Sequence, residues 1–176
     1  LDLAGEELYK RGHERFVNDA PLKETIAAGM ILEAISISSS ESSNISHSTF
    51  HIALIDPMAG SGTFSLEAAY MASGLIPGKC RDFALKHQPA FKPATWKHIV
   101  SSMDSLAPTG LRNDYKKAQV CPIANIITSD ISERAVNIIR HNIECCPGVQ
   151  SSTCEQTATS ISPQVHDFFT YTAQEI

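Results

Sequence analysis

Long apolar runs are missing from this 176-residue chain, in which no stretch approaches the roughly 20 residues that a bilayer-crossing helix needs. Residues 1–10 also lack the pattern of a signal peptide. These two absences predict a cytoplasmic protein with no membrane segment. Since 43% of the residues are hydrophobic, the chain is still expected to form one domain with a substantial core.

The cysteines lack the spacing of a structural site. The five cysteines are odd in number and include no Cys-x-x-Cys pair, and none of the seven histidines lies at metal-ligand spacing from one. A disulfide framework and a zinc site are both poorly supported, so we expect reduced thiols and no bound metal. The cysteines concerned are Cys80, Cys121, Cys145, Cys146 and Cys154.

A glycine-rich turn lies between a predicted strand and a predicted helix. Asp56–Thr63 reads Asp-Pro-Met-Ala-Gly-Ser-Gly-Thr, after the apolar run 51–55 and before the helical pattern 64–73. A strand, a turn and a helix in this order can hold a small polar ligand, because the residues that touch it must leave the backbone accessible. The contacting positions would be Ala59, Gly60, Ser61 and Gly62.

The turn lacks the residues that bind a triphosphate or a dinucleotide. A phosphate-binding loop needs Gly-Lys-Ser/Thr, whereas Gly62 is followed by Thr63. The dinucleotide fingerprint needs a third glycine, where Ser65 or Leu66 stands. Asp56 instead adds a negative charge, which suits a ligand that carries an ammonium group. S-adenosylmethionine is such a ligand.

Two further acids follow predicted strands. Asp130 comes shortly after the buried-strand pattern 123–128, and Asp167 lies in the segment 165–169. A carboxylate beside the glycine turn can accept hydrogen bonds from ribose hydroxyls, while Ile131 can pack against adenine and Asp167 can receive its amino group. Taken singly, Asp130 could equally be an acid favoured at a helix N-terminus, and Asp167 a surface turn residue. Three such acids in series are more specific than any one of them.

Four stretches of sequence resemble a known family: Leu1–Gly12, Ala20–Glu24, Asp56–Thr63 and Ser129–Ala135. In these stretches the chain resembles, as far as about Phe169, the bacterial large-subunit rRNA guanine-N2 methyltransferases, a THUMP-associated group long labelled as N6-adenine-specific methylases. The resemblance implies a class I S-adenosylmethionine-dependent methyltransferase fold, α/β and Rossmann-like, with a mostly parallel, doubly wound sheet that is incomplete here. The alternation of apolar strands with helices independently predicts a parallel doubly wound sheet.

The resemblance also assigns roles in binding S-adenosylmethionine. The turn would hold the methionine part, residues 21–23 would close over it, and Asp130 and Asp167 would take ribose and adenine. Lys23 could approach the cofactor carboxylate or be an ordinary residue of a first helical turn, and Glu67 is interpreted as a capping or helix-packing residue. The predicted cofactor-binding residues are Pro21, Leu22, Lys23, Asp56, Pro57, Met58, Ala59, Gly60, Gly62, Thr63, Asp130, Ile131 and Asp167.

The family's catalytic loop, Asn-Pro-Pro-Tyr, occurs nowhere in the chain, so we expect no catalytic residue here and no methyl transfer by these 176 residues alone. The complete protein is expected to methylate RNA, most simply guanine N2 of large-subunit rRNA. Adenine N6 is an alternative target, because related loops serve both bases, and a non-catalytic cofactor-binding or assembly module is another alternative. Residues 1–18 would then be a hairpin and linker from a missing N-terminal domain, and residues 19–176 the cofactor-binding part.

Coarser patterns predict the remaining elements. A hairpin with a turn at Arg11–Gly12 is expected over 8–16, followed by a helix over 21–35 that begins with a proline. Serine-rich residues 36–49 predict a mobile loop. Beyond the glycine turn we expect a helix that ends at Gly74, a strand at 123–128, a helix at 132–145, a polar loop at 147–163 and a strand at 165–169.

Residues 74–122 form an insertion that is too long for a simple connection. Between residues 79 and 98, Lys and Arg outnumber Asp and Glu, and aromatic residues lie among them. This composition is typical of a platform for single-stranded nucleic acid, with candidate phosphate contacts at Lys86, Lys92 and Lys97. In the alternative, the lysines only solubilise a helical insertion that aromatic side chains anchor onto the sheet. These aromatic residues are Phe83, Phe91 and Trp96.

Overall fold

The three described strands form one parallel sheet in the order β1-β2-β3. They are β1 (Ile52–Asp56), β2 (Ile123–Asp130) and β3 (Ser160–Val165). The computed structural model describes residues 2–12, 15–18, 20–41, 52–73, 75, 77–78, 81–105, 123–145 and 160–172. Among these residues, no helix has the length and hydropathy to cross a lipid bilayer.

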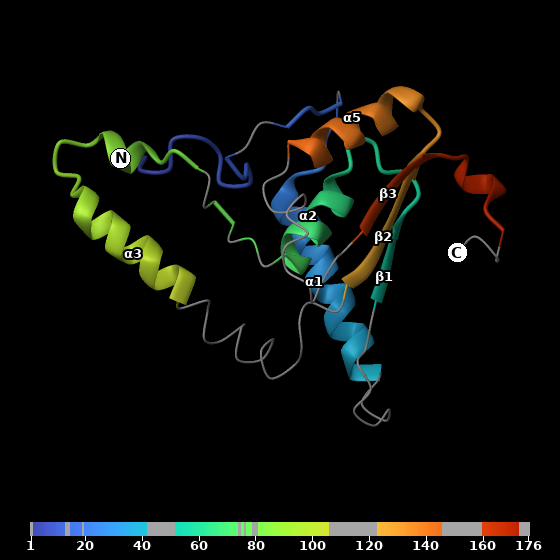
Figure 1. Ribbon diagram of the computed structural model, residues 1–176, viewed down its shortest axis with the longest axis horizontal. Helices are drawn as coiled ribbons and strands as arrows, with labels where there is room; N and C mark the ends of the chain where they lie inside the picture. Colours follow the sequence, from blue (N-terminus) through green and yellow to red (C-terminus); the bar gives the residue numbers. More distant parts are fainter. Residues whose placement is uncertain are drawn as a thin grey trace.

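The helices α2 (Thr63–Ala72) and α5 (Glu133–Glu144) pack on one face of this sheet, and α1 (Glu24–Glu41) packs on α2. Both strand-to-strand crossovers step in the same direction across the sheet. Because such connections are right-handed, they place α2 and α5 on the same face. Figure 1 shows α1, α2 and α5 to one side of the strands.

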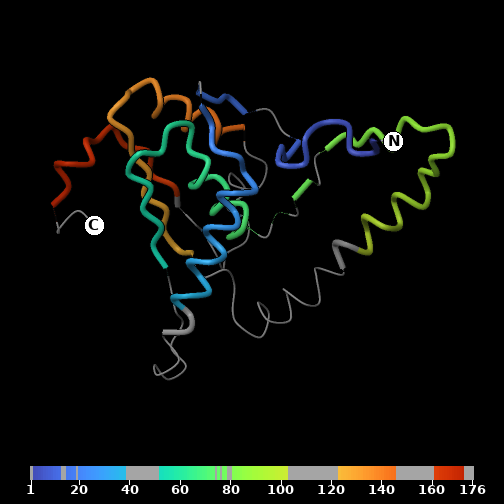
Figure 2. Tube along the Cα trace, turned by 180° about the vertical axis from the view of Figure 1, so that it is seen from behind, coloured from blue at the N-terminus to red at the C-terminus, as the bar shows by residue number. Residues whose placement is uncertain are grey.

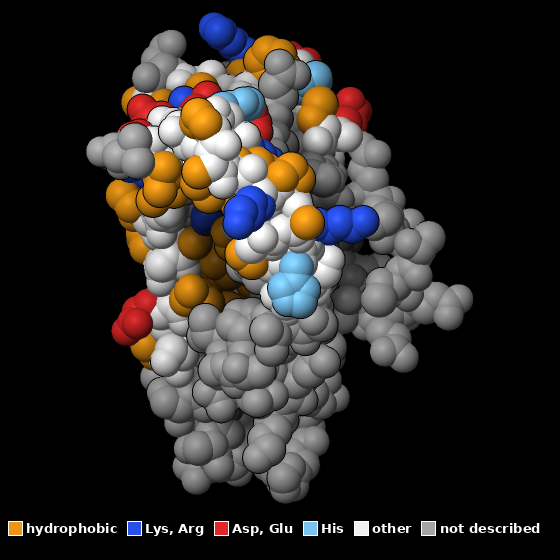
Figure 3. All heavy atoms as spheres, turned by 90° about the vertical axis from the view of Figure 1, so that its left-hand side faces the viewer, with side chains coloured by type: hydrophobic (Ala, Val, Ile, Leu, Met, Phe, Trp, Pro, Cys, Tyr) orange, Lys and Arg blue, Asp and Glu red, His pale blue; other side chains and the backbone are white. Residues whose placement is uncertain are grey.

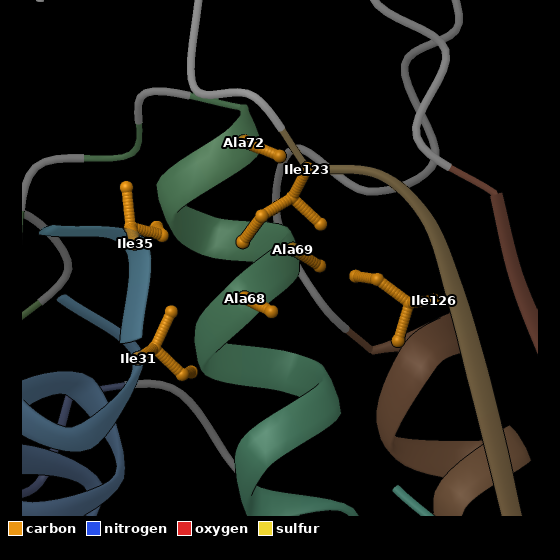
Figure 4. Packing of buried hydrophobic residues seen from close by; sticks show 7 residues of the cluster. All are labelled: Ile31, Ile35, Ala68, Ala69, Ala72, Ile123 and Ile126. Carbon is orange, nitrogen blue, oxygen red and sulfur yellow. The ribbon is translucent and has the colours of Figure 1, made fainter. Parts of the chain in front are cut away.

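The core lies where α2 is enclosed between α1 and β2. Figure 4 shows Ile31 and Ile35 of α1 on one side of α2, and Ile123 and Ile126 of β2 on the other. The small side chains of α2 that face this cluster allow both neighbours to approach closely; they are Ala68, Ala69 and Ala72. Truncating Ile126, which is buried, to alanine would cost about 2–5 kcal/mol in stability.

The first helix is longer than predicted and begins later. It starts at Glu24 instead of Pro21 and continues to Glu41, so the mobile loop predicted from residue 36 is wrong as far as residue 41. The hydroxyl of Ser38 donates to the carbonyl oxygen of Ala34 (2.9 Å), which satisfies a polar group within the helix. The rest of that predicted loop, residues 42–49, lies outside the described residues.

The predicted hairpin over 8–16 is also wrong, since residues 2–12 and 15–18 contain no strand. Gly12 does adopt a positive φ of 85°, which suits glycine. Its flanking segments, however, bond to side chains of other elements: Arg81 donates to the carbonyl oxygens of Glu6, Glu7 and Lys10 at 2.5–2.7 Å. Figure 2 shows these first residues beside the start of the insertion.

The last described strand begins earlier than predicted. β3 starts at Ser160 and ends at Val165, where the sequence pattern placed the strand's beginning. Pro163, assigned to a loop, pairs with Thr128 inside the ladder. Proline is tolerated there because β3 is an edge strand of the described sheet.

The insertion contains a short 3₁₀ helix, η2 (Ala84–His87), and the helix α3 (Pro93–Ser105). Figure 1 shows α3, which carries Trp96, well apart from the sheet, so the predicted anchoring of the insertion onto the sheet by its aromatic residues is wrong. The Trp96 ring instead packs against Phe83 and Phe91, with centroids 5.6 and 6.1 Å away. The remainder of the insertion, residues 106–122, is not described.

Of the five cysteines, Cys145 is described, as an exposed free thiol at the end of α5. The other four lie outside the described residues, so the predictions about disulfides and zinc are untested there.

Candidate functional site

The candidate site lies at the carboxyl ends of the three parallel strands. Asp56 ends β1 opposite Thr128, and Asp130 ends β2 opposite Val165. The backbone N–H of His166 then donates to the carbonyl oxygen of Asp130 (3.1 Å), which places Asp167 just beyond the same edge. Small ligands of open α/β sheets bind at such carboxyl ends.

The glycine turn needs its glycines for two reasons. Gly60 and Gly62 adopt φ angles of 58° and 78°, a left-handed conformation that glycine adopts without strain. A Cβ atom at Gly62 would lie 3.1 Å from Cγ1 of Ile139, whereas one at Gly60 would meet nothing within 4 Å. The backbone at Gly60 therefore faces open space, where a ligand can approach it closely.

Asp130 fastens the turn to the start of α5. One of its carboxylate oxygens accepts from the N–H of Gly60 (2.9 Å) and the other from the N–H of Ser132 (2.9 Å). The N–H of Ala59 also donates to the carbonyl oxygen of Ser129 (2.9 Å). The role at a helix N-terminus is thus present, and a carboxylate with about four acceptor positions retains two for ribose hydroxyls.

Asp56 is a buried carboxylate behind the turn, with only 8% of its surface exposed. Burial raises its pKa, and the charge of Asp130 adds to that effect, while hydrogen bonds from Ser65 oppose it. The Ser65 hydroxyl donates to Asp56 at 3.1 Å. An ionised carboxylate in this position is poorly solvated, so a neighbouring cation would stabilise it.

Asp167 caps a local turn. Its side chain accepts from the N–H of Phe169 (3.0 Å) at the start of η3 (Phe168–Thr170). This geometry fits the alternative interpretation as a turn residue, and the contact with adenine remains a prediction.

Each strand-end acid is followed by a large exposed apolar residue. Met58 and Ile131 are each 71% exposed, and Phe169 is 89% exposed. Large apolar side chains with this exposure are costly to leave in water and offer surface to a partly apolar ligand. Acids beside apolar side chains fit a nucleoside, which combines hydroxyl groups with a flat ring.

The segment predicted to close over the cofactor precedes α1. Pro21 and Lys23 are exposed and Leu22 is half-buried. The ammonium group of Lys23 lies over the Tyr9 ring, 5.4 Å from its centroid. The structure thus pairs Lys23 with an aromatic residue of the N-terminal segment, and its approach to a cofactor carboxylate remains a prediction.

Comparison with known proteins identifies the family. Residues 11–164 match the family described as RMKL-like, methyltransferase domain. The chain belongs to this family. It is 31% identical over 147 residues to the ribosomal RNA large subunit methyltransferase K/L of Hydrogenovibrio crunogenus, covering 82% of this chain and 18% of that protein. The chain thus spans under a fifth of the length of such curated relatives.

Solved structures show the same fold. A possible methylase from Clostridium difficile 630 is 25% identical with a TM-score of 0.62, over 98% of this chain and 37% of that one. SMU.472, described as a methyltransferase and solved in complex with SAH, is 26% identical with a TM-score of 0.57, over 93% and 34% of the two chains. The predicted class I methyltransferase fold and the predicted family are both confirmed.

Three residues of this family member that contact the turn or its helix were missed by sequence reasoning. The guanidinium of Arg15 contacts the hydroxyls of Ser61 and Thr63, and Asn142 contacts the carbonyl oxygen of Ser61. Arg11 makes two hydrogen bonds (2.9 and 2.6 Å) to Glu67, which is thereby an ion-pair partner as well as a helix-packing residue. The sequence held one signal of the Arg11 contact. Glu67 lies in an alanine-rich helix that is expected to be buried, and a buried carboxylate needs a cation nearby.

The candidate RNA contacts differ from one another. The ammonium group of Lys86 donates to the carbonyl oxygen of Arg81 (3.0 Å), lies 3.5 Å from Asp82 and sits over the Trp96 ring. Lys92 and Lys97 are exposed. Figure 3, which views the molecule from the side of the insertion, shows Lys and Arg side chains standing apart between apolar and uncharged groups. Lys92 and Lys97 are thus the better candidates for phosphate contacts.

Proposed function

We propose that this chain is the S-adenosylmethionine-binding part of a cytoplasmic RNA base methyltransferase that acts on guanine N2 of large-subunit rRNA. One observation carries the proposal: acids at the ends of three adjacent parallel strands lie along one edge of the sheet with a glycine turn of open backbone, in a chain of the RMKL-like methyltransferase family. The RNA substrate is inferred from relatives named as ribosomal RNA large subunit methyltransferases. Residues 19–176 would form the cofactor-binding part.

The residues present fit this cofactor. Asp56 offers a poorly solvated negative charge for the ammonium group, and Gly60 faces open space for the methionine chain. Asp130 retains acceptor positions for the ribose, and Ile131 exposes an apolar side chain for adenine. When bound, S-adenosylmethionine supplies an electrophilic methyl group.

The chain's own residues would bind and orient the cofactor and leave the target base to other parts of the protein. The string Asn-Pro-Pro-Tyr, which holds the target amine in the resembled family, is not in the sequence. Methyl transfer to an exocyclic amine depends chiefly on alignment of the two reactants. We therefore expect no incorporation of labelled methyl groups into rRNA by these 176 residues alone, and turnover would contradict this division of roles.

Calorimetry tests the cofactor assignment. S-adenosylmethionine and S-adenosylhomocysteine should bind more tightly than ATP or NAD. Asp130→Ala should weaken binding by about 1.5–3 kcal/mol, the loss expected for a hydrogen bond to a charged group. Asp82→Ala, which removes an exposed acid in the insertion, serves as the control and should change nothing. Tighter binding of NAD, or an Asp130→Ala variant with unchanged cofactor affinity, would refute the assignment.

A further inference from the structure

We propose that Arg15 and Asn142 are positioning residues of the cofactor site, which hold the glycine turn in the shape that receives the amino-acid half of the cofactor. This inference rests on the proposed function and adds residues far from the turn in sequence. Both residues contact Ser61, which follows Gly60, where the backbone faces open space.

Arg15 is a buried cation held against the turn. Only 8% of its side chain is exposed, and Nη1 pairs with Glu24 at 3.1 Å. Nη2 donates to the hydroxyls of Ser61 (3.2 Å) and Thr63. Both hydroxyl-bearing residues are themselves buried, so the guanidinium fixes the last part of the turn and the first residue of α2.

This placement of Arg15 has a cost in stability. The N-terminal end of a helix carries partial positive charge, which disfavours a cation next to Thr63. The Nε atom of Arg15 is also buried without a hydrogen-bond partner. Local arrangements that break such rules are expected at functional sites. We infer that the guanidinium holds the turn in its observed conformation.

Asn142 holds the turn from α5. It is 3% exposed, and its Oδ1 accepts from the N–H of Phe16 (2.8 Å). Its Nδ2 donates to the carbonyl oxygens of Phe16 (2.8 Å) and Ser61 (3.2 Å). The amide thereby joins the segment that carries Arg15 to the turn that Arg15 contacts. The turn is held by one connected network from the N-terminal segment and from α5.

Loss of these contacts should weaken binding of the methionine part of the cofactor more than binding of its nucleoside part. In the proposed site the turn receives the methionine part, whereas Ile131 and Asp167 receive the adenine. A turn that is held less firmly should lose contacts with the methionine part, because binding depends on donors fixed within a fraction of an ångström. The nucleoside part should be affected much less.

Arg15→Lys and Asn142→Asp test this split. Lysine keeps the charge near Glu24 but lacks the forked donors, and aspartate keeps the shape of asparagine but loses both donations. We expect each variant to bind S-adenosylhomocysteine about tenfold more weakly. Each should bind 5′-methylthioadenosine, which lacks the amino-acid part, within about twofold of wild type.

Arg11→Lys is the matched control, because Arg11 lies in the same segment and contacts Glu67 of α2 without contacting the turn. It should leave the affinity for both ligands within about twofold. If Arg15→Lys weakened both ligands equally, or neither, the positioning role would be refuted.

Hydrogen exchange without cofactor provides a second readout. Amides of residues 59–65 should exchange faster in Arg15→Lys than in wild type, while those of β2 keep their protection. Unchanged exchange in the turn would overturn the inference even if the chain bound no cofactor. A wild-type chain that binds no S-adenosylhomocysteine would refute the proposed function separately.

Discussion

The ion pairs of the strand-end edge and those of the insertion differ in burial and in the separation of their partners. At the edge, charged groups are buried and find partners far along the chain, such as Arg11 with Glu67 and Arg15 with the turn. In the insertion, Asp82 pairs with Lys86 and His87, within five residues and largely in solvent. Buried charges with distant partners need the whole fold to satisfy them, whereas exposed local pairs contribute little. The contrast predicts that loss of a buried, paired charge at the strand-end edge costs more stability than loss of one of these exposed charges.

The largest expected effect is on stability and comes from breaking the buried pair. Glu67→Gln should lower the free energy of unfolding by about 3–5 kcal/mol, since it leaves the Arg11 guanidinium without a counter-charge. Urea denaturation measures this loss. The matched change in the insertion, Asp82→Asn, should leave the unfolding curve where it is.

The double variant Arg11→Met/Glu67→Met is the control for this prediction. It should recover much of the loss, because no charge is left buried without a partner. If Glu67→Gln unfolded at the same urea concentration as wild type, the contrast between the two regions would fail.

The next effect is a dependence of stability on pH at Asp56. Burial raises the pKa of this carboxyl above its ordinary value of 3.8. Such a group stabilises the fold below the unfolded value, and that stabilisation is lost as the pH rises through the folded value. Asp56→Asn should therefore unfold at a higher temperature than wild type at pH 7, with an advantage that shrinks as the pH falls through the folded value and is gone below about pH 4.

The Asp56→Asn variant should also bind S-adenosylmethionine more weakly, because it lacks the carboxylate that would pair with the ammonium group of the cofactor. Thermal unfolding over a pH series, with calorimetry at pH 7, measures both effects. In the insertion, hydrogen bonding from His87 lowers the pKa of Asp82, so Asp82→Asn should gain no stability at pH 7. A less stable Asp56→Asn variant at pH 7 would contradict the assignment of Asp56 as a poorly solvated charge.

The smallest expected effect is on the salt dependence of RNA binding, and it tests whether the lysines of the insertion contact phosphates. If Lys92 and Lys97 contact phosphates, replacing each with alanine should reduce the slope of log K against log salt by roughly 0.7 for single-stranded RNA. Lys86→Ala is the control, since that ammonium group already pairs with Asp82 and the Arg81 carbonyl. Filter binding over a salt series measures the slopes. Equal slopes for wild type and the Lys92→Ala/Lys97→Ala variant would leave the lysines as solubilising groups.

The turn and the strand-end acids could be predicted from the sequence because each is recognised from a few consecutive residues. An acid after an apolar run and a glycine turn before a helix are local patterns, and parallel pairing brings such ends together at one edge. The fold class and the family followed from the same patterns. Their places in the structure agree with the predicted arrangement for Asp56, Gly60 and Asp130.

What sequence missed depends on partners far apart in the chain. Arg15 and Ser61 are separated by 46 residues, and Phe16 and Asn142 by 126, so no local pattern joins them. The predicted hairpin was wrong for the same reason, since its flanks bond to Arg81 and Asn142 instead of to each other. The strand around Pro163 was missed because proline was taken as a sign of a loop. Proline is excluded from central strands but is tolerated in an edge strand such as β3.

The most direct test of the central claim is to map the binding of S-adenosylhomocysteine by NMR. The account predicts chemical-shift changes at the amides of Gly60, Gly62, Asp130 and Ile131, with the indole signal of Trp96 unchanged. These amides lie at the strand ends, whereas Trp96 packs within the insertion. Changes concentrated at Trp96 and its neighbours, or no changes at the strand ends at saturating ligand, would contradict the account.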